Sequence, residues 1–311
     1  MASIVKPITI EEEYKKNPDI SPEEIKKLRD WLKTQPHLPE NHLTDVDLLI
    51  VYHCCQKSIE VSKQVLDLHF TLRTLFQPFF KDRAYDKKAE FALNTVCYLI
   101  KMFHVEGYKV GYFRLLDPDY RNFNLLETVR AFMIVYDLWQ YEEGTWPGFV
   151  ILIDMEMATL SHVTRLDLMV VKKVLYFLQE CMLCKLKGVH FMNAPYFMDR
   201  LLMLIRPYLK KDLMDLLQTH QAGAESIENL ISKKALPKES GGENKDRLTL
   251  RDEQHKRMLA NSAFVREENK RRVNESLRPQ GKPSPAEKEF GLQGSFKKST
   301  VLVNKISSVN T

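Results

Sequence analysis

The cysteines are the residues of this 311-residue chain whose type and spacing could most directly do chemistry. Cys181 and Cys184 are spaced like a metal-binding pair, but a zinc site needs a second such pair, and Cys54 and Cys55 are adjacent. Cys97 is the fifth, so the number is odd, and all five lie in apolar stretches. The pattern predicts reduced, buried thiols in a cytosolic protein, with no metal site and no cofactor.

Acidic and basic side chains near predicted strand ends are the next candidates. Asp154 and Glu156 would share a face of a strand, but no partner nucleophile or metal accompanies them, which favours a turn at the strand end. His162, His190 and His220 are interpreted as structural, although one could hydrogen-bond a polar ligand group. The sequence has no nucleophile elbow, phosphate-binding loop, dinucleotide-binding turn or zinc-protease helix. The chain is therefore predicted not to be an enzyme.

The elements that must position these residues fall into two groups. Up to about residue 80 the pattern is helical: Ser21 opens one helix, Thr44 opens a second, and a third spans about residues 59 to 75. Beyond residue 87, helices alternate with strands. Helices are predicted at 91–103, 125–141, 166–183, 196–205 and 226–231, and strands at 108–116, 149–153, 188–192 and 216–219. This alternation predicts an α/β fold with a mainly parallel sheet.

The positive charge of the chain is concentrated towards its end. The net charge is +5, but from residue 243 to residue 311 fifteen Lys and Arg stand against nine Asp and Glu, so the rest of the chain is near −1. The body is therefore predicted not to bind nucleic acid. Residues 246–311 are interpreted as a basic, mostly disordered tail, in which residues 250–273 could form a charged helix.

Apolar runs are short throughout the sequence. The N-terminus has no apolar segment long enough for a signal peptide, and there is no run of about 18 apolar residues that would span a bilayer. The chain is therefore predicted to be cytoplasmic.

Three segments, in order, resemble motifs of the CRAL-TRIO family, which includes retinaldehyde-binding and alpha-tocopherol transfer proteins. Residues 185–195 read Lys-Leu-Lys-Gly-Val-His-Phe-Met-Asn-Ala-Pro and are similar to the family's basic lead-in, strand and Asn-x-Pro turn. Residues 204–209 read Leu-Ile-Arg-Pro-Tyr-Leu and follow at the family's distance. Residues 236–242 read Leu-Pro-Lys-Glu-Ser-Gly-Gly and are similar to its closing motif. The likeness covers about residues 20 to 245.

The resemblance implies a particular domain organisation. A helical N-terminal domain would occupy residues 1–80, and a CRAL-TRIO domain would occupy residues 81–245. In that domain a mainly parallel sheet flanked by helices encloses an apolar cavity.

Two positions depart from the family's pattern. Met157 replaces the glycine of an Asp-x-x-Gly turn after the second strand, and methionine cannot adopt a positive φ cheaply. Cys55 stands where the helical region usually carries an arginine of an Arg-x-Arg motif. The first departure should alter a turn beside the cavity, and the second removes a basic group from a region that the family uses for phosphoinositide head groups.

By the resemblance, nine apolar side chains line the cavity and hold a ligand with few polar contacts. They are Ala131, Val135, Phe149, Ile151, Ile153, Phe177, Leu178, Val189 and Phe191. The alternative is that each packs against protein, as core residues do in any α/β fold.

The segment at residues 196–205 is apolar all round in its second half. Such a helix is either buried on every side or meets something apolar outside the fold. The resemblance makes it the family's mobile gate, which would carry apolar side chains to a membrane on opening. These are Phe197, Met198, Leu201, Leu202 and Ile205. The alternative is an ordinary core helix.

Five basic residues are candidates for contact with anionic lipid. By the resemblance, Lys185 and Lys187 stand where alpha-tocopherol transfer protein binds phosphoinositide phosphates, and Arg206, Lys210 and Lys211 could lie nearby. Lysines near an anionic membrane contribute roughly 1 kcal/mol each. The alternative is plain solvation of these side chains.

Two hypotheses of different classes follow. The first is an intracellular carrier that binds one hydrophobic small molecule, a tocopherol-, retinoid- or phosphoinositide-like lipid, in a gated cavity. It would transfer this lipid between membranes by peripheral, reversible contact. The second is a non-transferring scaffold or regulatory protein that uses the same fold to bind proteins, which the divergence at Met157 and Cys55 favours. Apolar linings discriminate by shape, so residue types do not name the lipid.

Overall fold

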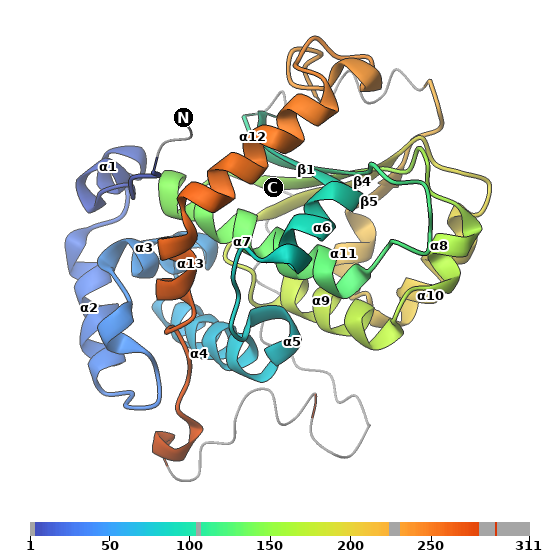
Figure 1. Ribbon diagram of the computed structural model, residues 1–311. Coiled ribbons are helices and arrows are strands. Elements are labelled where there is room, and N and C mark those ends of the chain that lie inside the picture. The colour runs from blue at the N-terminus through green and yellow to red at the C-terminus, as the bar shows by residue number, and fades with distance from the viewer. Residues whose placement is uncertain (1–3, 104–106, 224–230, 280–289, 291–311) are drawn as a thin grey trace.

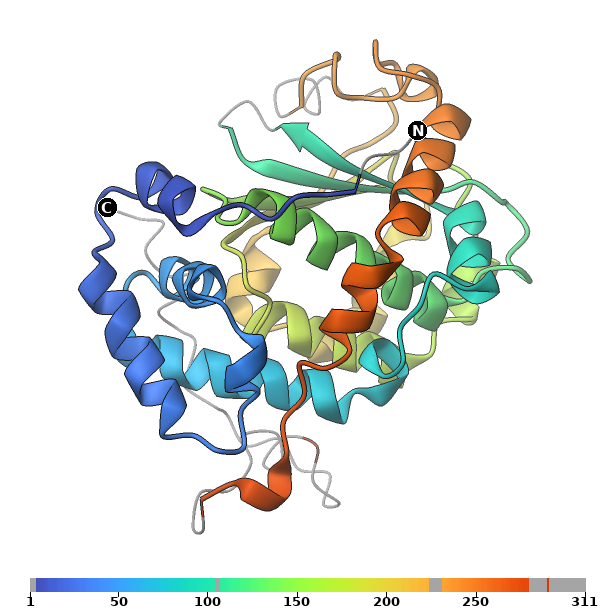
Figure 2. The same cartoon turned by 60° about the vertical axis from the view of Figure 1, so that its left-hand side comes forward.

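The N-terminal helices lie together on one side of the molecule (Figures 1 and 2). The computed structural model describes residues 4–103, 107–223, 231–279 and 290. The helices are α1 (Ile10–Lys16), α2 (Pro22–Lys33), α3 (Asp45–Cys54), α4 (Ile59–Leu75) and α5 (Gln77–Phe80), with a 3-10 turn η1 (Glu40–His42) between α2 and α3. The three helices predicted in this region are confirmed.

Short-range hydrogen bonds fix where α2 and α3 begin. The Glu24 carboxylate accepts a hydrogen bond of 3.0 Å from the Ser21 backbone N–H. At the start of α3, the Thr44 N–H donates to Asp47 Oδ2 at 2.7 Å, and the Asp47 N–H donates back to Thr44 Oγ1 at 3.3 Å. Each pair forms a capping box, which satisfies N–H groups that the helix itself cannot bond.

A five-stranded sheet in the order β1-β2-β3-β4-β5 forms the centre of the body. β1 (Val96–Phe103) is antiparallel to β2 (Lys109–Leu115), whereas β2, β3 (Phe149–Asp154), β4 (Leu186–Met192) and β5 (Leu217–Thr219) are parallel. The prediction of an α/β fold with a mainly parallel sheet is confirmed. The crossover helices cover one face of β3, and the segment that contains Ile231 and Leu236 covers the other face. Burial on both faces explains the uninterrupted apolar sequence of this strand.

The helix predicted over residues 91–103 is wrong in its second half. α6 (Lys87–Thr95) ends where β1 begins. Residues 96–103 instead pair antiparallel with β2, which otherwise would present an open edge. A short apolar run is compatible with a buried helix or a strand, so periodicity alone did not separate the two.

The crossovers between parallel strands lie on one face of the sheet (Figures 1 and 2). They are α7 (Leu125–Glu143) between β2 and β3; α8 (Leu160–Thr164) and α9 (Leu168–Glu180) between β3 and β4; and α10 (Met198–Ile205), η2 (Arg206–Tyr208) and α11 (Lys211–Asp215) between β4 and β5. On the other face, Ile231 and Leu236 pack against Val110, Val150 and Leu152. The closing segment then makes a turn, η4 (Lys238–Ser240). Except for its last residue, the helix predicted at 226–231 lies outside the described residues.

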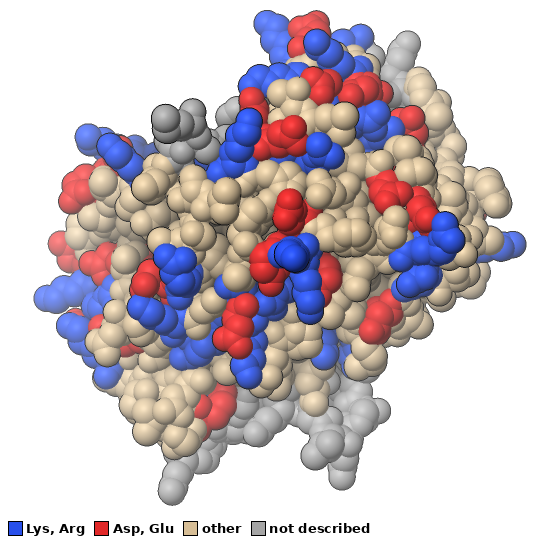
Figure 3. All heavy atoms as spheres, viewed as in Figure 1, with Lys and Arg blue, Asp and Glu red and all other residues tan. Residues whose placement is uncertain are grey.

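The C-terminal segment differs from the prediction of a mostly disordered tail over the part that the structure describes. It forms α12 (Arg247–Ala260), α13 (Ser262–Glu268) and a turn η5 (Glu275–Leu277). Met258 and Val265 are buried against a hydrophobic cluster that includes Val135 of α7. Figure 3 shows basic and acidic side chains interspersed on the face that these helices share. A narrow apolar stripe within a highly charged sequence is therefore enough to order this segment.

Candidate functional site

A cavity of about 320 Å3 lies between the sheet and its crossover helices. Thr128 is the one polar residue in the lining, among those that the structure describes. The lining comprises Val96, Phe113, Leu125, Thr128, Val129, Phe132, Met133, Ile151, Ile153, Leu166, Val171, Val174, Leu175, Leu178, Met182, Val189, Phe191, Leu201, Ile205, Leu209, Leu213 and Leu217. An apolar pocket of this size, which is partly open to the outside, suits a hydrophobic small molecule and offers it little polar chemistry. We call it the sheet cavity.

The floor of the sheet cavity follows from the two-residue period of strands. Ile151 and Ile153 of β3 are opposite Val189 and Phe191 of β4 in the parallel register. Their side chains share one face of the sheet, because alternate residues point the same way. Phe113 of β2 is opposite Ile153 and extends this floor. With Leu178 of α9, the structure places five of the nine predicted lining residues at the cavity.

The other four predicted lining residues lie elsewhere. Ala131 and Val135 are on the opposite face of α7, packed in a cluster with α6, α12 and α13, while Val129, Phe132 and Met133 face the cavity. α7 is buried on two faces, so its hydrophobic pattern did not show which one meets the cavity. The remaining two belong to aromatic clusters: Phe149 stacks on Trp146 at 5.6 Å between ring centroids, and Phe177 lies 5.1 Å from Phe80.

Helix α10 has apolar side chains on both its inner and its outer face. Leu201 and Ile205 line the sheet cavity. On the outer face, Met203 is 72% exposed and Leu204 is 38% exposed, and Tyr196, just before the helix, is 88% exposed. The other predicted gate residues are turned inwards: Phe197 and Met198 are buried, and Leu202 is half-buried. Sequence reasoning missed the outward set, because an all-apolar run carries no sign of which side faces solvent.

The five predicted basic residues do not form one cluster of exposed charge. Lys185 is half-buried, with its Nζ 3.2 Å from His53 Nε2, and burial lowers the pKa of the Lys185 amine. Lys187 lies 5.7 Å from the centre of the Tyr108 ring. The remaining three follow α10: Lys210 forms an ion pair with buried Glu180, whereas Arg206 and Lys211 are exposed.

Asp154 is held in a buried network at the end of β3. Its Oδ2 accepts hydrogen bonds from Arg114 at 2.6 Å and from the Tyr112 hydroxyl at 2.7 Å, and its Oδ1 accepts one from the Asn193 amide at 2.9 Å. Arg114 also pairs with Glu156. The Arg114 guanidinium therefore bridges Asp154 and Glu156, and these two acids lie in the turn at the end of β3. Tyr112 and Arg114 were missed, although their i, i+2 spacing places them on one strand face.

The turn after β3 has a left-handed residue at the position where the resemblance expects a glycine. Met157 has φ of 70°, a conformation that strains residues with a Cβ. The neighbouring network of Asp154 and Arg114 is fully buried and fixes the turn from the other side. Met157 therefore holds a strained backbone conformation in this turn.

The cysteines and other possible metal ligands do not form a recognisable site within the described residues. Cys54, Cys55, Cys181 and Cys184 are all buried. Within the described ranges, no group of three or more His, Cys, Asp or Glu side chains is placed to hold a metal ion. Nor does any helix in that part of the chain have the length and apolarity needed to cross a bilayer.

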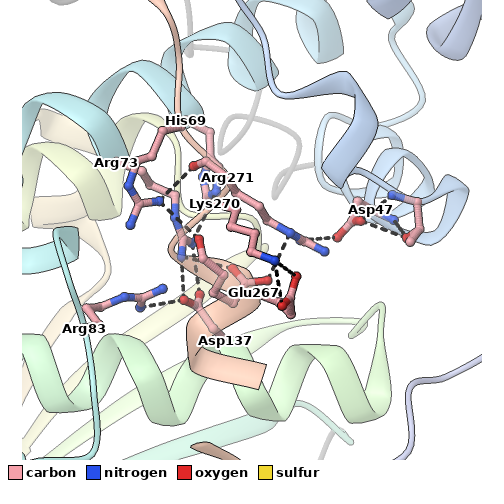
Figure 4. Close-up of polar contacts among 11 residues, drawn as sticks. Asp47, His69, Arg73, Arg83, Asp137, Glu267, Lys270 and Arg271 are labelled. Carbon is pink, nitrogen blue, oxygen red and sulfur yellow. Dashed lines mark hydrogen bonds and ion pairs between the residues drawn. The ribbon is translucent and has the colours of Figure 1, made fainter. Parts of the chain in front are cut away.

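A second buried network joins the N-terminal helices, α7 and the C-terminal segment (Figure 4). Arg73 of α4 donates to Asp137 of α7 through both terminal nitrogens, at 3.0 and 2.5 Å, and to Glu268 of α13 at 3.3 Å. Arg83 donates to Asp137 at 2.7 Å. Arg271 pairs with Glu268 and reaches Asp47 of α3 at 2.8 Å. We call these six residues the clasp.

The charges of the clasp compensate one another. Burial alone would raise the pKa of Asp137, but Arg73 and Arg83 outweigh it and hold this pKa well below its usual range. Burial raises the pKa of the Glu268 carboxyl, which Arg271 and Arg73 partly offset. Three carboxylates face three guanidinium groups, so the charges of these six residues compensate one another, and the nearby Arg272 guanidinium donates to the backbone carbonyls of Glu268, Arg271 and Phe80. Such a network positions segments, because a buried ion that loses its partner is costly.

The α/β body thus has an apolar cavity between its sheet and its crossover helices, and Asp137 and Asp154 are held in buried ion pairs. Residues 93–242 match the family described as CRAL/TRIO domain, and residues 17–89 match the family described as Pinta-like, UBA domain. Residues 93–242 are therefore a CRAL/TRIO domain. The resemblance seen in its motifs is thereby confirmed.

Individual relatives and one solved structure have low sequence identity to this chain. Clavesin-1 of Pongo abelii is 26% identical over 242 residues, which cover 76% of this chain and 68% of that protein. The alpha-tocopherol transfer protein-like protein of Mus musculus is 30% identical over 122 residues, 39% of this chain and 36% of that protein. The crystal structure of Sfh5 aligns with a TM-score of 0.43 and 13% identity, covering 74% of this chain and 92% of that chain. The domain match supports lipid binding in general terms.

Proposed function

We propose that this protein binds one hydrophobic small molecule in the sheet cavity and transfers it between membranes. The observation that carries the proposal is the cavity itself, about 320 Å3 with an almost wholly apolar lining. An empty apolar cavity destabilises a fold, and a ligand that fills it restores the lost contacts. A tocopherol-, retinoid- or phosphoinositide-like lipid would exchange the apolar interior of a bilayer for that of the protein.

Helix α10 is the element that we propose as the gate. Its inner side chains Leu201 and Ile205 close the cavity, and its outer side chains Met203 and Leu204 are already exposed. Burying such side chains in a membrane interface contributes about 25 cal/mol per Å2. Contact through the outer face would hold the protein at the membrane, while movement of the helix opens the cavity to the bilayer.

Basic side chains near the gate add attraction to anionic lipid. Arg206 and Lys211 are exposed near the gate, and we expect them to meet an anionic membrane surface. Lys185 lies against His53, and its amine is lowered in pKa by burial, so it contributes less. The geometry favours general attraction to anionic lipid over a dedicated phosphoinositide pocket.

The cavity is tested by filling it. Val174 is a half-buried residue of α9 that lines the sheet cavity, and Val174→Trp would occupy much of the space. We expect the variant to keep its melting temperature and to lose transfer of a fluorescent lipid between vesicles. A correctly folded Val174→Trp protein that transfers lipid at the wild-type rate would contradict the proposal.

The gate is tested separately at its outer face. Met203→Asp combined with Leu204→Asp should abolish sedimentation with vesicles, because charge replaces the apolar contact. The matched control is Leu248→Asp with Leu259→Asp, two exposed leucines of α12 that are 55% and 64% exposed. The control should bind vesicles like wild type. Equal loss in both double variants would show that α10 has no special role.

A further inference from the structure

A second cavity, of about 350 Å3, lies where the N-terminal helices meet the body. Its walls come from residues 7–9, α3, α4, α7 and α13, and from the chain just after α9. It has apolar walls such as Ile50, Leu66 and Phe264, but also polar groups, which the sheet cavity almost lacks. We call it the interface chamber. The inference below rests on the proposed function of the sheet cavity.

Two methionines form the wall between the cavities. Met133 of α7 and Met182, just after α9, line both the sheet cavity and the interface chamber. Both are buried, at 3% and 1% exposed. Methionine side chains are unbranched and have three rotatable bonds, so they fill irregular gaps and adapt readily to a neighbour. A rotation of these side chains would join the cavities without any movement of the backbone.

The polar residues of the interface chamber define the chemistry that it accepts. Arg73 lines the chamber and is 4% exposed, and its Nε has no hydrogen-bond partner within the described residues. A buried donor without an acceptor is costly, so a ligand oxygen placed there would be stabilised. Arg73 also belongs to the clasp, in which three guanidinium groups already face three carboxylates. A charged ligand group would unbalance this buried network, whereas an uncharged acceptor would not.

We propose that the interface chamber takes the polar end of a long, uncharged amphiphile whose apolar chain occupies the sheet cavity, with Met133 and Met182 as the movable wall between them. The ligand class is one with a single terminal hydroxyl or carbonyl oxygen on an extended hydrocarbon. A phosphorylated lipid does not fit, because its charge would enter the clasp uncompensated.

Three isoprenoid probes test this inference: geranylgeraniol, farnesol, which is one isoprene unit shorter, and geranylgeranyl phosphate, which is charged. Uptake of each tritium-labelled probe from neutral phosphatidylcholine vesicles is measured for matched variants. Val46→Trp fills the interface chamber, and Val174→Trp fills the sheet cavity; both are half-buried helical valines. Val46→Trp should weaken uptake of geranylgeraniol about tenfold or more, because the polar end of this longer alcohol loses its site in the interface chamber. Uptake of farnesol should be unchanged, because the shorter chain is expected to stay within the sheet cavity.

Each outcome bears on one claim. If Val46→Trp takes up geranylgeraniol like wild type, the interface chamber is not a ligand site, while the sheet cavity stands as long as Val174→Trp loses both alcohols. If Val174→Trp still takes up both geranylgeraniol and farnesol like wild type, the proposed function itself is contradicted. Equal uptake of geranylgeranyl phosphate and geranylgeraniol would contradict the claim that the polar end of the ligand must be uncharged. Ile50→Phe, a smaller addition to the same chamber, replaces Val46→Trp if that variant does not fold.

Discussion

The sheet cavity and the interface chamber are held open by different interactions. The sheet cavity is enclosed by aliphatic and aromatic side chains, which impose shape but no direction. The interface chamber is bordered by the clasp, whose six charged residues fix α3, α4, α7 and α13 by directional ion pairs. The walls of the sheet cavity can adjust to a bound ligand, whereas the clasp fixes the relative positions of the helices around the interface chamber. A carrier needs both properties.

The comparison also predicts where mutations are tolerated. An apolar wall loses only contacts when one side chain is trimmed, and its neighbours can relax. A buried ion pair adds little when intact, yet leaves an uncompensated charge when one partner is removed. The clasp should therefore be the more fragile region.

The largest expected effect is at the centre of the clasp. Asp137→Ala leaves Arg73 and Arg83 buried without their shared carboxylate, and we expect a loss of about 3–5 kcal/mol in unfolding free energy. Urea denaturation measures it. Asp19→Ala removes an exposed partner of Lys57 and is the control, which should unfold like wild type. Equal midpoints for the two variants would remove the distinction between the regions.

The next largest loss of stability is expected from a substitution in the C-terminal segment. Met258 of α12 is 1% exposed, so Met258→Ala should cost about 2–4 kcal/mol of unfolding free energy through the cavity that it leaves. Leu259→Ala, at its exposed neighbour, serves as the control and should have little effect. If both substitutions are silent in thermal denaturation, the segment does not pack on the body.

Acidification should act at the junction of α3 and β4. Burial, and then the nearby Lys185, lower the pKa of His53 from 6.5 to about 4. The unfolded chain gains a proton at this histidine below its ordinary pKa, and the folded chain does not until about pH 4. Stability from this residue is therefore present at neutral pH and is lost as pH falls through that window, by on the order of 2 kcal/mol. His53→Gln should flatten the dependence between pH 6.5 and 4, and an unchanged slope would contradict this assignment.

The smallest expected effect is at the strained turn after β3. Met157→Gly relieves a positive φ, and we expect a gain of about 0.5–1 kcal/mol after the added freedom of the unfolded chain is subtracted. Calorimetry should show a slightly raised melting temperature. A lowered one would mean that the methionine side chain stabilises the turn by more than its backbone strains it.

Local signals predicted much of this fold. Helix caps such as Thr44 with Asp47 act within four residues, so the starts of α2 and α3 followed from the sequence. The face of β3 and β4 that meets the cavity followed from alternation, since Ile151, Ile153, Val189 and Phe191 all line it. Both inferences use geometry contained within one element.

The rest depended on contacts between distant segments. α7 is buried on two faces, and only the packing of Met258 and Val265 on one of them shows that Ala131 and Val135 face away from the cavity. The strand β1 exists because β2 offers it an edge. The interface chamber joins residues that are more than two hundred positions apart, as Asp47 and Arg271 are, and no local pattern reveals such a site.

The most direct test of the central claim is native mass spectrometry of the full chain purified from cells, with extraction of any bound molecule into organic solvent. The account predicts that wild-type protein carries one lipid molecule per chain, and that Val174→Trp, with the sheet cavity filled, carries none. Wild-type protein that is found only at the mass of the bare chain, in a folded state and from lipid-containing cells, would contradict it.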